Sequence, residues 1–121
     1  MKHKILIVDD EPNIVMSLEY AFKKQDFEVF IARDGSEALE ILKEQTPDIV
    51  LLDIMMPNVD GYQTLKHINN TSGLEASKVV FLTAKNKASD IEKGLKLGAD
   101  KYVTKPFSVK KLVSEIMELL T

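Results

Sequence analysis

The sequence predicts a single α/β domain in which a parallel sheet of five strands, in the order 2-1-3-4-5, is flanked by five helices in a doubly wound arrangement. Three observations lead to this prediction. Short apolar runs alternate with amphipathic stretches, turn residues separate the two, and no repeat or linker interrupts the chain of 121 residues. We therefore expect one domain over residues 1–121.

Nearly continuous apolar runs that are rich in β-branched residues predict the strands. They lie at residues 5–8, 29–32, 49–52, 79–82 and, more weakly, 102–103. Runs without an alternation of polar and apolar residues are typical of a parallel sheet that is covered on both faces.

Apolar residues at helical spacing predict a helix after each of these runs. Pro12 suits the first turn of the first helix. The helix faces that we expect to be buried comprise Ile14, Leu18 and Phe22; Ala38, Ile41 and Leu42; Tyr62, Leu65 and Ile68; Ile91 and Leu95; and Leu112, Ile116 and Leu119.

Polar residues and glycine indicate where some helices begin and end. Asp34 with Glu37, and Ser89 with Glu92, have the spacing of a capping box, so both pairs are expected at helix starts. Gly98 suits the end of the fourth helix.

The composition excludes several classes of function. The 16 Lys and Arg residues against 19 Asp and Glu residues give a formal net charge of -3, which offers no general attraction to nucleic acid or to an anionic membrane. The chain has no Cys, so it has no disulfide or thiolate site, and we expect a cytoplasmic location. No apolar run approaches the ~20 residues that cross a bilayer. We expect neither direct nucleic-acid binding nor a membrane contact.

Four of the five predicted strands end in residues that can take part in chemistry. Asp9 and Asp10 follow the first strand, Asp53 the third, Thr83 the fourth and Lys105 the fifth. Each of them alone would also suit a helix cap, a loop or a turn. Ligands of parallel sheets bind beyond the carboxyl ends of the strands, and the order 2-1-3-4-5 brings these four ends together. The shared position therefore predicts one polar site.

Three carboxylates at one site call for a cation. Two unit charges about 5 Å apart repel by about 3 kcal/mol at an effective dielectric constant near 20. Mg²⁺ is the natural candidate because it prefers oxygen ligands and keeps several waters, and Mn²⁺ could substitute for it. His3 and His67 lie outside the strand ends, so a zinc site is not expected.

These residues resemble those of a response-regulator receiver domain, the phosphoacceptor unit of two-component systems. The resemblance covers essentially the whole chain. It implies a chemotaxis-regulator-like (flavodoxin-like) fold and a regulatory switch rather than an enzyme with an external substrate. It rests on residues 5–11 (ILIVDDE), 48–61 (DIVLLDIMMPNVDG), 82–84 (LTA), 98–100 (GAD) and 102–107 (YVTKPF).

The resemblance implies that Asp53 accepts the phosphoryl group. It also implies that Asp10 and Asp53 bind Mg²⁺ directly, together with the backbone carbonyl of Met55, while Asp9 acts through a bound water. Met55 and Lys85 occupy positions that tune the rate of dephosphorylation in the family.

Further roles concern the fourth and fifth strand ends. By resemblance, Thr83 is the switch hydroxyl that hydrogen-bonds a phosphoryl oxygen, and Lys105 pairs with the phosphate through its ammonium. The Lys105–Pro106 peptide bond is expected to be cis. We expect the Tyr102 ring to enter the space that Thr83 vacates, which would alter the surface of the fourth helix, fifth strand and fifth helix.

The expected partners follow from the resemblance. The chain has no GxxxxGK[ST] loop for a nucleotide, and the resemblance implies that the phosphoryl donor is a phosphohistidine on a sensor histidine kinase or a histidine phosphotransfer protein. Asn13, Ser17 and Tyr20 are candidates for the face that docks it. The output is expected through a downstream protein target or a fused output domain. DNA-binding members of the family that the chain resembles pair through the surface of the fourth helix, fifth strand and fifth helix with a fixed set of charges. Because Lys101 stands where those members commonly have an acidic residue and residues 109–120 contain no Arg, a monomer or a weak dimer is expected.

Three other readings compete with this one. A phosphatase of the haloacid-dehalogenase type would need a second carboxylate in Asp53-Ile54-Met55, where it is missing. A cofactor binder of the flavodoxin type would have its phosphate repelled by Asp9, Asp10 and Glu11. A phosphate-independent interaction module with the receiver fold remains open, since it would share every feature of the fold.

Overall fold

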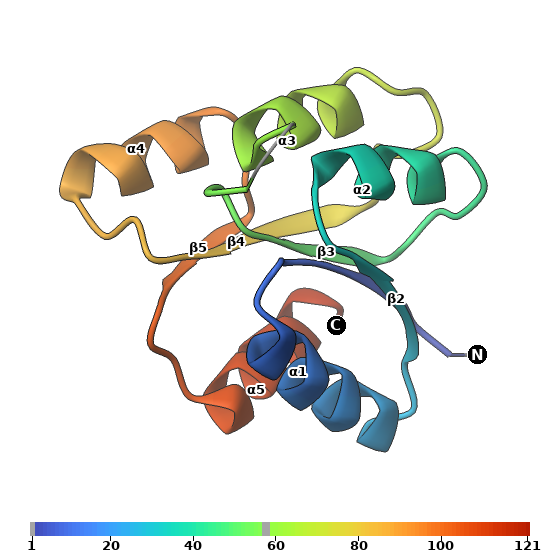
Figure 1. The fold of residues 1–121 in the computed structure, drawn as a ribbon. Coiled ribbons are helices and arrows are strands. Elements are labelled where there is room, and N and C mark those ends of the chain that lie inside the picture. Colours follow the sequence, from blue (N-terminus) through green and yellow to red (C-terminus); the bar gives the residue numbers. More distant parts are fainter. Residues whose placement is uncertain (1, 57–58) are drawn as a thin grey trace.

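The computed structural model describes residues 2–56 and 59–121, in which five strands alternate with five helices. Figure 1 shows their arrangement. Pro57 and Asn58 of the motif at 48–61 lie outside the described residues. The elements are β1 Lys4–Val8, α1 Pro12–Lys24, β2 Glu28–Ala32, α2 Gly35–Leu42, β3 Ile49–Leu52, α3 Gly61–Asn69, β4 Lys78–Thr83, α4 Ala88–Lys96, β5 Lys101–Thr104 and α5 Val109–Leu119.

The five strands form one parallel sheet, as the alternation of strands and helices predicted, and their order β2-β1-β3-β4-β5 is the expected one that brings the four reactive strand ends together. In this sheet Val8 is in register with Leu52, and Leu52 with Phe81. The carboxyl ends of the three central strands therefore lie at one edge, next to the residues that follow them.

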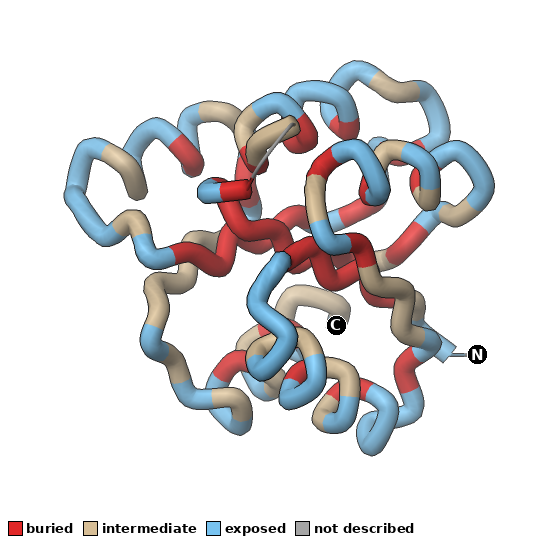
Figure 2. The backbone as a smooth tube through the Cα atoms, viewed as in Figure 1, coloured by how far each residue is buried: buried red, intermediate tan, exposed pale blue. Residues whose placement is uncertain are grey.

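Helices cover both faces of the sheet. α1 and α5 lie on one face, and α2, α3 and α4 on the other (Figure 1). Figure 2 shows that the buried residues concentrate in the central strands. One hydrophobic cluster, which includes Leu6, Val50 and Phe81, packs under α2, α3 and α4, and a second, which includes Ile7 and Leu51, packs under α1 and α5. The residues of each strand thus alternate between two cores, which explains why the strands read as continuous apolar runs.

Most of the expected helix boundaries are confirmed. Pro12 opens α1, and the Asp34 side chain caps α2 by accepting a hydrogen bond from the Glu37 backbone N–H at 2.9 Å. Gly98, with φ 108°, follows the last residues of α4. A positive φ of this kind favours glycine because it carries no Cβ.

The expected cap at Ser89 is wrong. α4 begins at Ala88 after Lys87, and no side chain hydrogen-bonds at its start. Ser89 lies inside the first turn of the helix. Capping is a local preference worth about 1 kcal/mol, and here the contact of Gly94 with β5 positions the helix instead.

The expected burial of Leu95 is also wrong, because its side chain is 46% exposed. β5 is the last strand of the sheet, so on the outer side of α4 no further strand or helix of the described chain covers this position. The other predicted helix faces are buried or half-buried.

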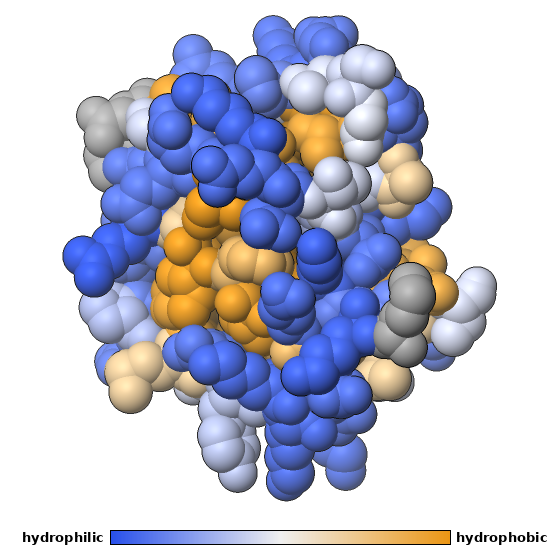
Figure 3. Space-filling view, turned by 90° about the vertical axis from the view of Figure 1, so that its right-hand side faces the viewer, coloured by the Kyte–Doolittle hydropathy of each residue, from blue (hydrophilic) through white to orange (hydrophobic). Residues whose placement is uncertain are grey.

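The opposite edge of the sheet is formed by β2. Figure 3, which looks onto that side of the molecule, shows hydrophobic side chains gathered near the centre and framed by polar ones. Val29, Phe30 and Ile31 of β2 are only partly buried. Among the described residues, no helix is both long and apolar enough to cross a membrane.

Candidate functional site

Three carboxylates meet at the carboxyl edge of the sheet, as the strand-end residues predicted. Asp9 and Asp10 follow β1, and Asp53 follows β3. The backbone N–H of Asp53 donates to the Val8 carbonyl at 3.0 Å, which continues the pairing of the two strands past their ends. One carboxylate oxygen from each of the three residues lies within 4.8 Å of the others.

The three carboxylates differ in burial and in what holds them. Asp9 and Asp53 are 2% and 4% exposed, whereas Asp10 is exposed. Asp9 Oδ1 accepts a hydrogen bond from the Glu11 backbone N–H at 2.9 Å, and Asp53 Oδ1 accepts one from the Met55 N–H at 3.0 Å. The backbone of the two loops thus orients both buried carboxylates.

The Lys105 side chain reaches into this cluster. Its Nζ lies 3.1 Å from Asp53 Oδ2, 2.9 Å from Asp9 Oδ2 and 2.8 Å from Glu11 Oε1. The Lys105 backbone N–H donates to the Thr83 carbonyl at 2.8 Å, so that β4 anchors the base of this side chain. The peptide bond between Lys105 and Pro106 is cis.

Glu11 is a member of the cluster that the sequence reasoning missed. It was considered only as a source of repulsion to a phosphate, yet its carboxylate makes the shortest contact with Lys105. Its place directly after Asp9 and Asp10 was a signal that Glu11 could belong to the site. The sequence alone, however, does not show in which direction a loop side chain points.

The cluster carries more negative than positive charge. Burial raises the pKa of the Asp9 carboxyl, and the hydrogen bond from Glu11 and the charge of Lys105 oppose that shift only in part. Burial also acts against the charged form of Lys105, but hydrogen bonds with Glu11 and Asp9 and the charges around it outweigh burial and raise its pKa. Lys105 therefore stays an ammonium, and the cluster contains this one ammonium together with the carboxylates of four acidic residues.

This donor set fits a hard divalent cation. Every side chain of the trio offers oxygen only, which suits Mg²⁺ or Mn²⁺ better than zinc. In the described part of the chain, the Asp10 carboxylate has no hydrogen-bond or ion-pair partner, whereas Asp9 Oδ2 is paired with the Lys105 ammonium. The Asp10 oxygens therefore remain available to a cation or to its waters.

Thr83 and Tyr102 lie beside the cluster and are linked through Lys85. Thr83 is fully buried at the end of β4, and its Oγ1 lies 3.4 Å from the Lys85 backbone N–H. The Tyr102 hydroxyl donates to the Lys85 carbonyl at 2.9 Å. The structure thus joins both residues to one peptide segment, while no contact among the described residues joins Thr83 directly to the carboxylates.

The Tyr102 ring lies half-buried between β4 and α4. It contacts the Phe81 ring edge-to-face at a centroid distance of 5.9 Å. A Cβ on Gly94 would lie 2.9 Å from this ring, so only glycine lets α4 approach so closely. Burial is the main cause that raises the pKa of Tyr102 to about 12.

Gly61 is a second residue that the sequence reasoning missed. A Cβ at this position would lie 2.6 Å from the Asp53 carbonyl oxygen, so that the start of α3 packs directly on the loop of Asp53. Asp60, just before it, caps α3 in a capping box with Gln63. The spacing of Asp60 and Gln63 was the available signal for this start.

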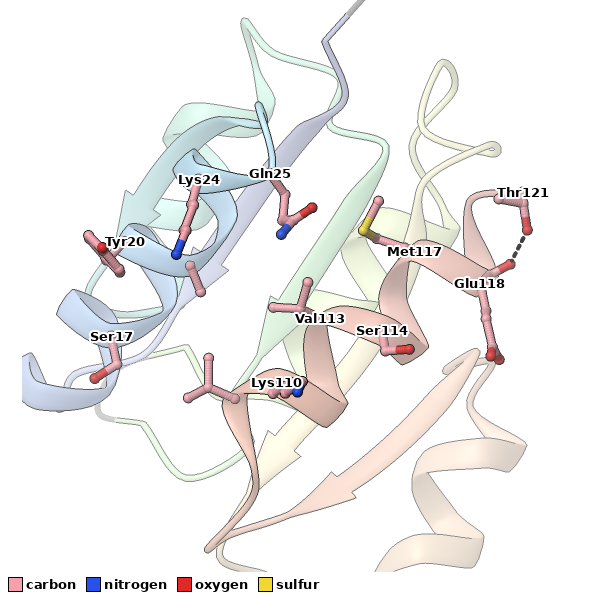
Figure 4. Close-up of a pocket in the computed structure, with 12 residues that line it drawn as sticks. Ser17, Tyr20, Lys24, Gln25, Lys110, Val113, Ser114, Met117, Glu118 and Thr121 are labelled. Carbon is pink, nitrogen blue, oxygen red and sulfur yellow. Dashed lines mark hydrogen bonds between the residues drawn. The ribbon is translucent and has the colours of Figure 1, made fainter.

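Two hollows lie on the side of the cluster that faces α1. One, of about 550 Å³, is lined by Glu11, Asn13, Ser17 and Lys105 among others. The other, of about 870 Å³, lies between α1 and α5 and away from the carboxylates, and Figure 4 shows Ser17 and Tyr20 on its α1 side. Asn13, Ser17 and Tyr20 are all exposed, and Ser17 lines both hollows.

Comparison with known proteins agrees with this geometry. The family model for the response regulator receiver domain matches residues 5–117. The beryllofluoride-activated receiver domain of DrrB is 32% identical, with a TM-score of 0.91, and the match covers 99% of this chain and 98% of that one. The chemotaxis protein CheY4 of Vibrio cholerae is 25% identical, with a TM-score of 0.90 and 98% coverage of both chains.

Some similar proteins are longer than this chain. The response regulator DrrB of Thermotoga maritima, described as an OmpR/PhoB homologue, is 32% identical with a TM-score of 0.89. The match covers 99% of this chain but 53% of that one. The matched fold is therefore one part of a larger regulator in that protein.

Proposed function

The chain belongs to the family of response regulator receiver domains, a regulatory and non-enzymatic module of two-component signalling, and from this premise we propose that it is a switch that accepts a phosphoryl group on Asp53. We further propose that residues 1–121 form one such domain and that it works in the cytoplasm. The observation that carries the proposal is the Asp53 carboxylate, buried beside two other carboxylates and one ammonium.

The surroundings of Asp53 prepare its carboxylate for attack on phosphorus. The Met55 backbone N–H donates a hydrogen bond to Asp53 Oδ1, and the Lys105 ammonium donates one to Asp53 Oδ2. In the transfer, an Asp53 oxygen forms the new O–P bond while the N–P bond of a phosphohistidine breaks, and the electron pair of that bond stays on the imidazole nitrogen. The ammonium of Lys105 favours the ionised carboxylate and neutralises charge on the transferring oxygens.

A magnesium ion would be held by Asp10, Asp53 and the Met55 carbonyl, with Asp9 acting through a water. When bound, it supplies positive charge that stabilises the oxygens of the phosphoryl group. The excess of carboxylates over ammonium groups, and the Asp10 carboxylate that has no partner in the described chain, support this assignment.

The phosphoryl donor is proposed to be a phosphohistidine on a sensor histidine kinase or a histidine phosphotransfer protein. Asn13, Ser17 and Tyr20 are proposed to dock it, because Asn13 and Ser17 line the hollow that Lys105 also lines. A donor bound in that hollow would place its phosphohistidine next to Lys105, which contacts the Asp53 carboxylate.

The proposed switch runs through Thr83 and Tyr102. Thr83 would hydrogen-bond a phosphoryl oxygen, which would draw its hydroxyl away from the Lys85 segment. Since Tyr102 bonds the carbonyl of the same segment, a shift there would change how its ring supports α4. Met55, which is 56% exposed, and Lys85 stand where they could govern access of water to the phosphoryl group.

The experiment is incubation of the chain with acetyl phosphate and Mg²⁺, followed by intact mass. We expect a gain of one phosphoryl group in the wild type and in Asp26→Asn, an exposed control, and no gain in Asp53→Asn. A gain that persists in Asp53→Asn would place the acceptor elsewhere. A wild type without any gain would favour the phosphate-independent interaction module.

A further inference from the structure

The outer edge of β2 carries backbone groups that have no partner. At the two ends of this strand, the Glu28 N–H and the Ala32 carbonyl bond to the segment that contains β1. Alternate residues of a strand in a parallel ladder direct both backbone groups to the same side, so Phe30 also bonds to β1, whereas Val29 and Ile31 direct theirs away from the sheet. The N–H and C=O groups of these two residues therefore have no partner within the described chain.

The stretch with free groups is limited at both ends. Before it, the Phe27 N–H donates to the last turn of α1 at 3.0 Å, and after it the Arg33 N–H donates to Glu37 Oε1 at 3.0 Å. Neither donor is available to a further strand. On this side of the described sheet, the edge that can pair is therefore residues 29–31, which we call the β2 edge. It offers two donors and two acceptors to another chain.

Apolar surface lies on both sides of the β2 edge, between α1 and α2 (Figure 1). On the side of α1, a hollow of about 390 Å³ is lined by Pro12, Val15, Met16, Ile31 and Arg33. Met16 is 67% exposed although it is apolar. On the side of α2, Phe30 is only partly buried. An added strand would place alternate side chains on these two surfaces.

Two charged residues bracket the β2 edge. Glu28 directly precedes it and Arg33 follows it by two positions. Both residues are exposed, and neither has an ion-pair partner among the described residues. A strand antiparallel to β2 would bring its amino end to Arg33 and its carboxyl end to Glu28. Complementary charge therefore requires an acidic residue near the start of that strand and a basic residue near its end.

We propose that the β2 edge binds an extended segment of a partner protein, which adds to the sheet as a sixth, antiparallel strand. The segment has three consecutive apolar residues opposite residues 29–31, an acidic residue two positions before them and a basic residue directly after them. Its first and third apolar residues exchange four backbone hydrogen bonds with Val29 and Ile31, which provide affinity, and its side chains provide specificity. The inference goes beyond the proposed function and is independent of it, because no residue of β2 belongs to the carboxylate cluster.

A second copy of the chain fits this edge less well than an isolated segment does. Two β2 strands could pair antiparallel about Phe30 and satisfy the same groups. However, both α1 and α2 contact β2. Neighbouring strands lie only about 4.8 Å apart, whereas packed helices need about 8–10 Å between their axes. The helices of two copies would therefore collide beside the junction, and an isolated segment brings no helix with it.

The test uses the full chain in EDTA and a labelled peptide of this pattern, with the sequence DTVIVK between polar flanks. Fluorescence anisotropy measures binding, and amide chemical shifts locate it. N-methyl groups on the first and third apolar residues remove the donors that face β2, whereas one on the second apolar residue points away from it. We expect the doubly methylated peptide to bind at least about tenfold more weakly than the unmodified one, and the singly methylated peptide to bind within about threefold of it. The largest shifts should lie at residues 29–31.

Variants of the chain test the side-chain contacts. Arg33→Glu should weaken binding of this peptide about five- to tenfold, and a peptide with Lys in place of its acidic residue should restore the binding to this variant. Met16→Gln should weaken binding about threefold, whereas the exposed controls Lys66→Glu and Met117→Gln should change it less than about twofold.

Four results with the peptides would overturn the proposal. They are no binding of DTVIVK, equal binding of the unmodified and doubly methylated peptides, tighter binding of the reversed sequence KVIVTD, and shifts confined to another face. A dimer of the chain, detected by light scattering, with its interface shifts at residues 29–31 would also overturn it, because the occupant would then be a second copy. Since binding is measured in EDTA, none of these results bears on the modification of Asp53 by acetyl phosphate.

Discussion

Lys105 is the residue on which the carboxylate cluster depends most. Its side chain is only 10% exposed and contacts Asp9, Asp53 and Glu11. Without this ammonium, two buried carboxylates would face each other with no compensating charge unless a metal ion is bound. The loss of one partner from a buried ion pair is costly because the other charge stays desolvated.

We predict that Lys105→Ala lowers the free energy of unfolding by about 1–3 kcal/mol in the presence of EDTA. The measurement is urea denaturation at pH 7. The control is Lys96→Ala, which removes an exposed pair with Glu92 and should change stability by less than about 0.5 kcal/mol. Equal stability of Lys105→Ala and the wild type would mean that the carboxylates are solvated well enough without it.

Asp9 gives the pH dependence a definite sign. Burial raises its pKa above the ordinary value of 3.8, so the unfolded chain loses this proton at a lower pH than the folded chain. Between the two pKa values the folded state binds more protons, and stability therefore falls as the pH rises through that interval.

Without Mg²⁺, the wild type should thus lose stability relative to Asp9→Asn as the pH increases from about 3.8, until the difference levels off above the folded pKa. Urea denaturation at successive pH values measures this difference. Asp26→Asn, at an exposed position, should give a curve parallel to that of the wild type. A wild type that gains stability relative to Asp9→Asn as the pH rises would show that the pKa of Asp9 is lowered instead.

At the scale of elements, the two helices that flank β5 are held differently. α5 begins with a side-chain cap, in which Ser108 Oγ accepts a hydrogen bond from the Lys111 N–H at 3.2 Å. α4 has no such cap and contacts the strand beneath it through Gly94. A helix that lacks a cap is the easier of the two to shift, which suits an element proposed to respond to Tyr102.

We predict that Ser108→Ala lowers the free energy of unfolding by about 1 kcal/mol, since it leaves a backbone N–H of the first turn without its acceptor. Ser89→Ala should be neutral, because Ser89 lies within α4 and caps nothing. Thermal denaturation of the pair measures both. A loss in Ser89→Ala as large as that in Ser108→Ala would restore Ser89 as a cap.

At the scale of the whole molecule, the carboxylate cluster links cation binding to stability. A ligand that binds only the folded chain stabilises it by about 1.4 kcal/mol at ten times its Kd. Mg²⁺ should therefore raise the Tm of the wild type by several degrees over EDTA at equal ionic strength, and Mn²⁺ should do the same.

Asp10→Asn should lose most of this increase, because it removes an exposed carboxylate that holds no other group in the described chain. Asp26→Asn serves as the control and should keep it. If Asp10→Asn gained as many degrees as the wild type, the cation would bind somewhere other than the strand-end carboxylates.

Much of the molecule was predictable from local patterns. The apolar runs predicted every strand to within two residues at either end, and helical spacing predicted five helices. These patterns are reliable because burial on both faces demands continuous apolar strands, and burial on one face demands a helical stripe. Asp9, Asp10, Asp53 and Lys105 were predicted to meet because parallel strands end at one edge.

The predictions that were wrong or incomplete concern side chains whose environment depends on their neighbours in the folded chain. Leu95 follows the helical pattern but is exposed because β5 is the edge strand. Ser89 has a capping spacing, yet the helix begins one residue before it. Glu11 was not among the expected site residues, yet its exposed side chain contacts Lys105.

By itself, the sequence determined that this chain is a five-stranded parallel α/β domain with an acidic site at the strand ends, because short-range spacing and hydrophobicity fix the strands and helices, and the polar residues at four strand ends indicate an order that brings them together. Only the tertiary structure decided that Glu11 joins the site, that Gly61 and Gly94 allow the close approach of α3 and α4, and that Leu95 faces an open edge. Those outcomes depend on contacts between residues distant in the chain, where one missing Cβ or one absent neighbouring strand changes what a side chain touches.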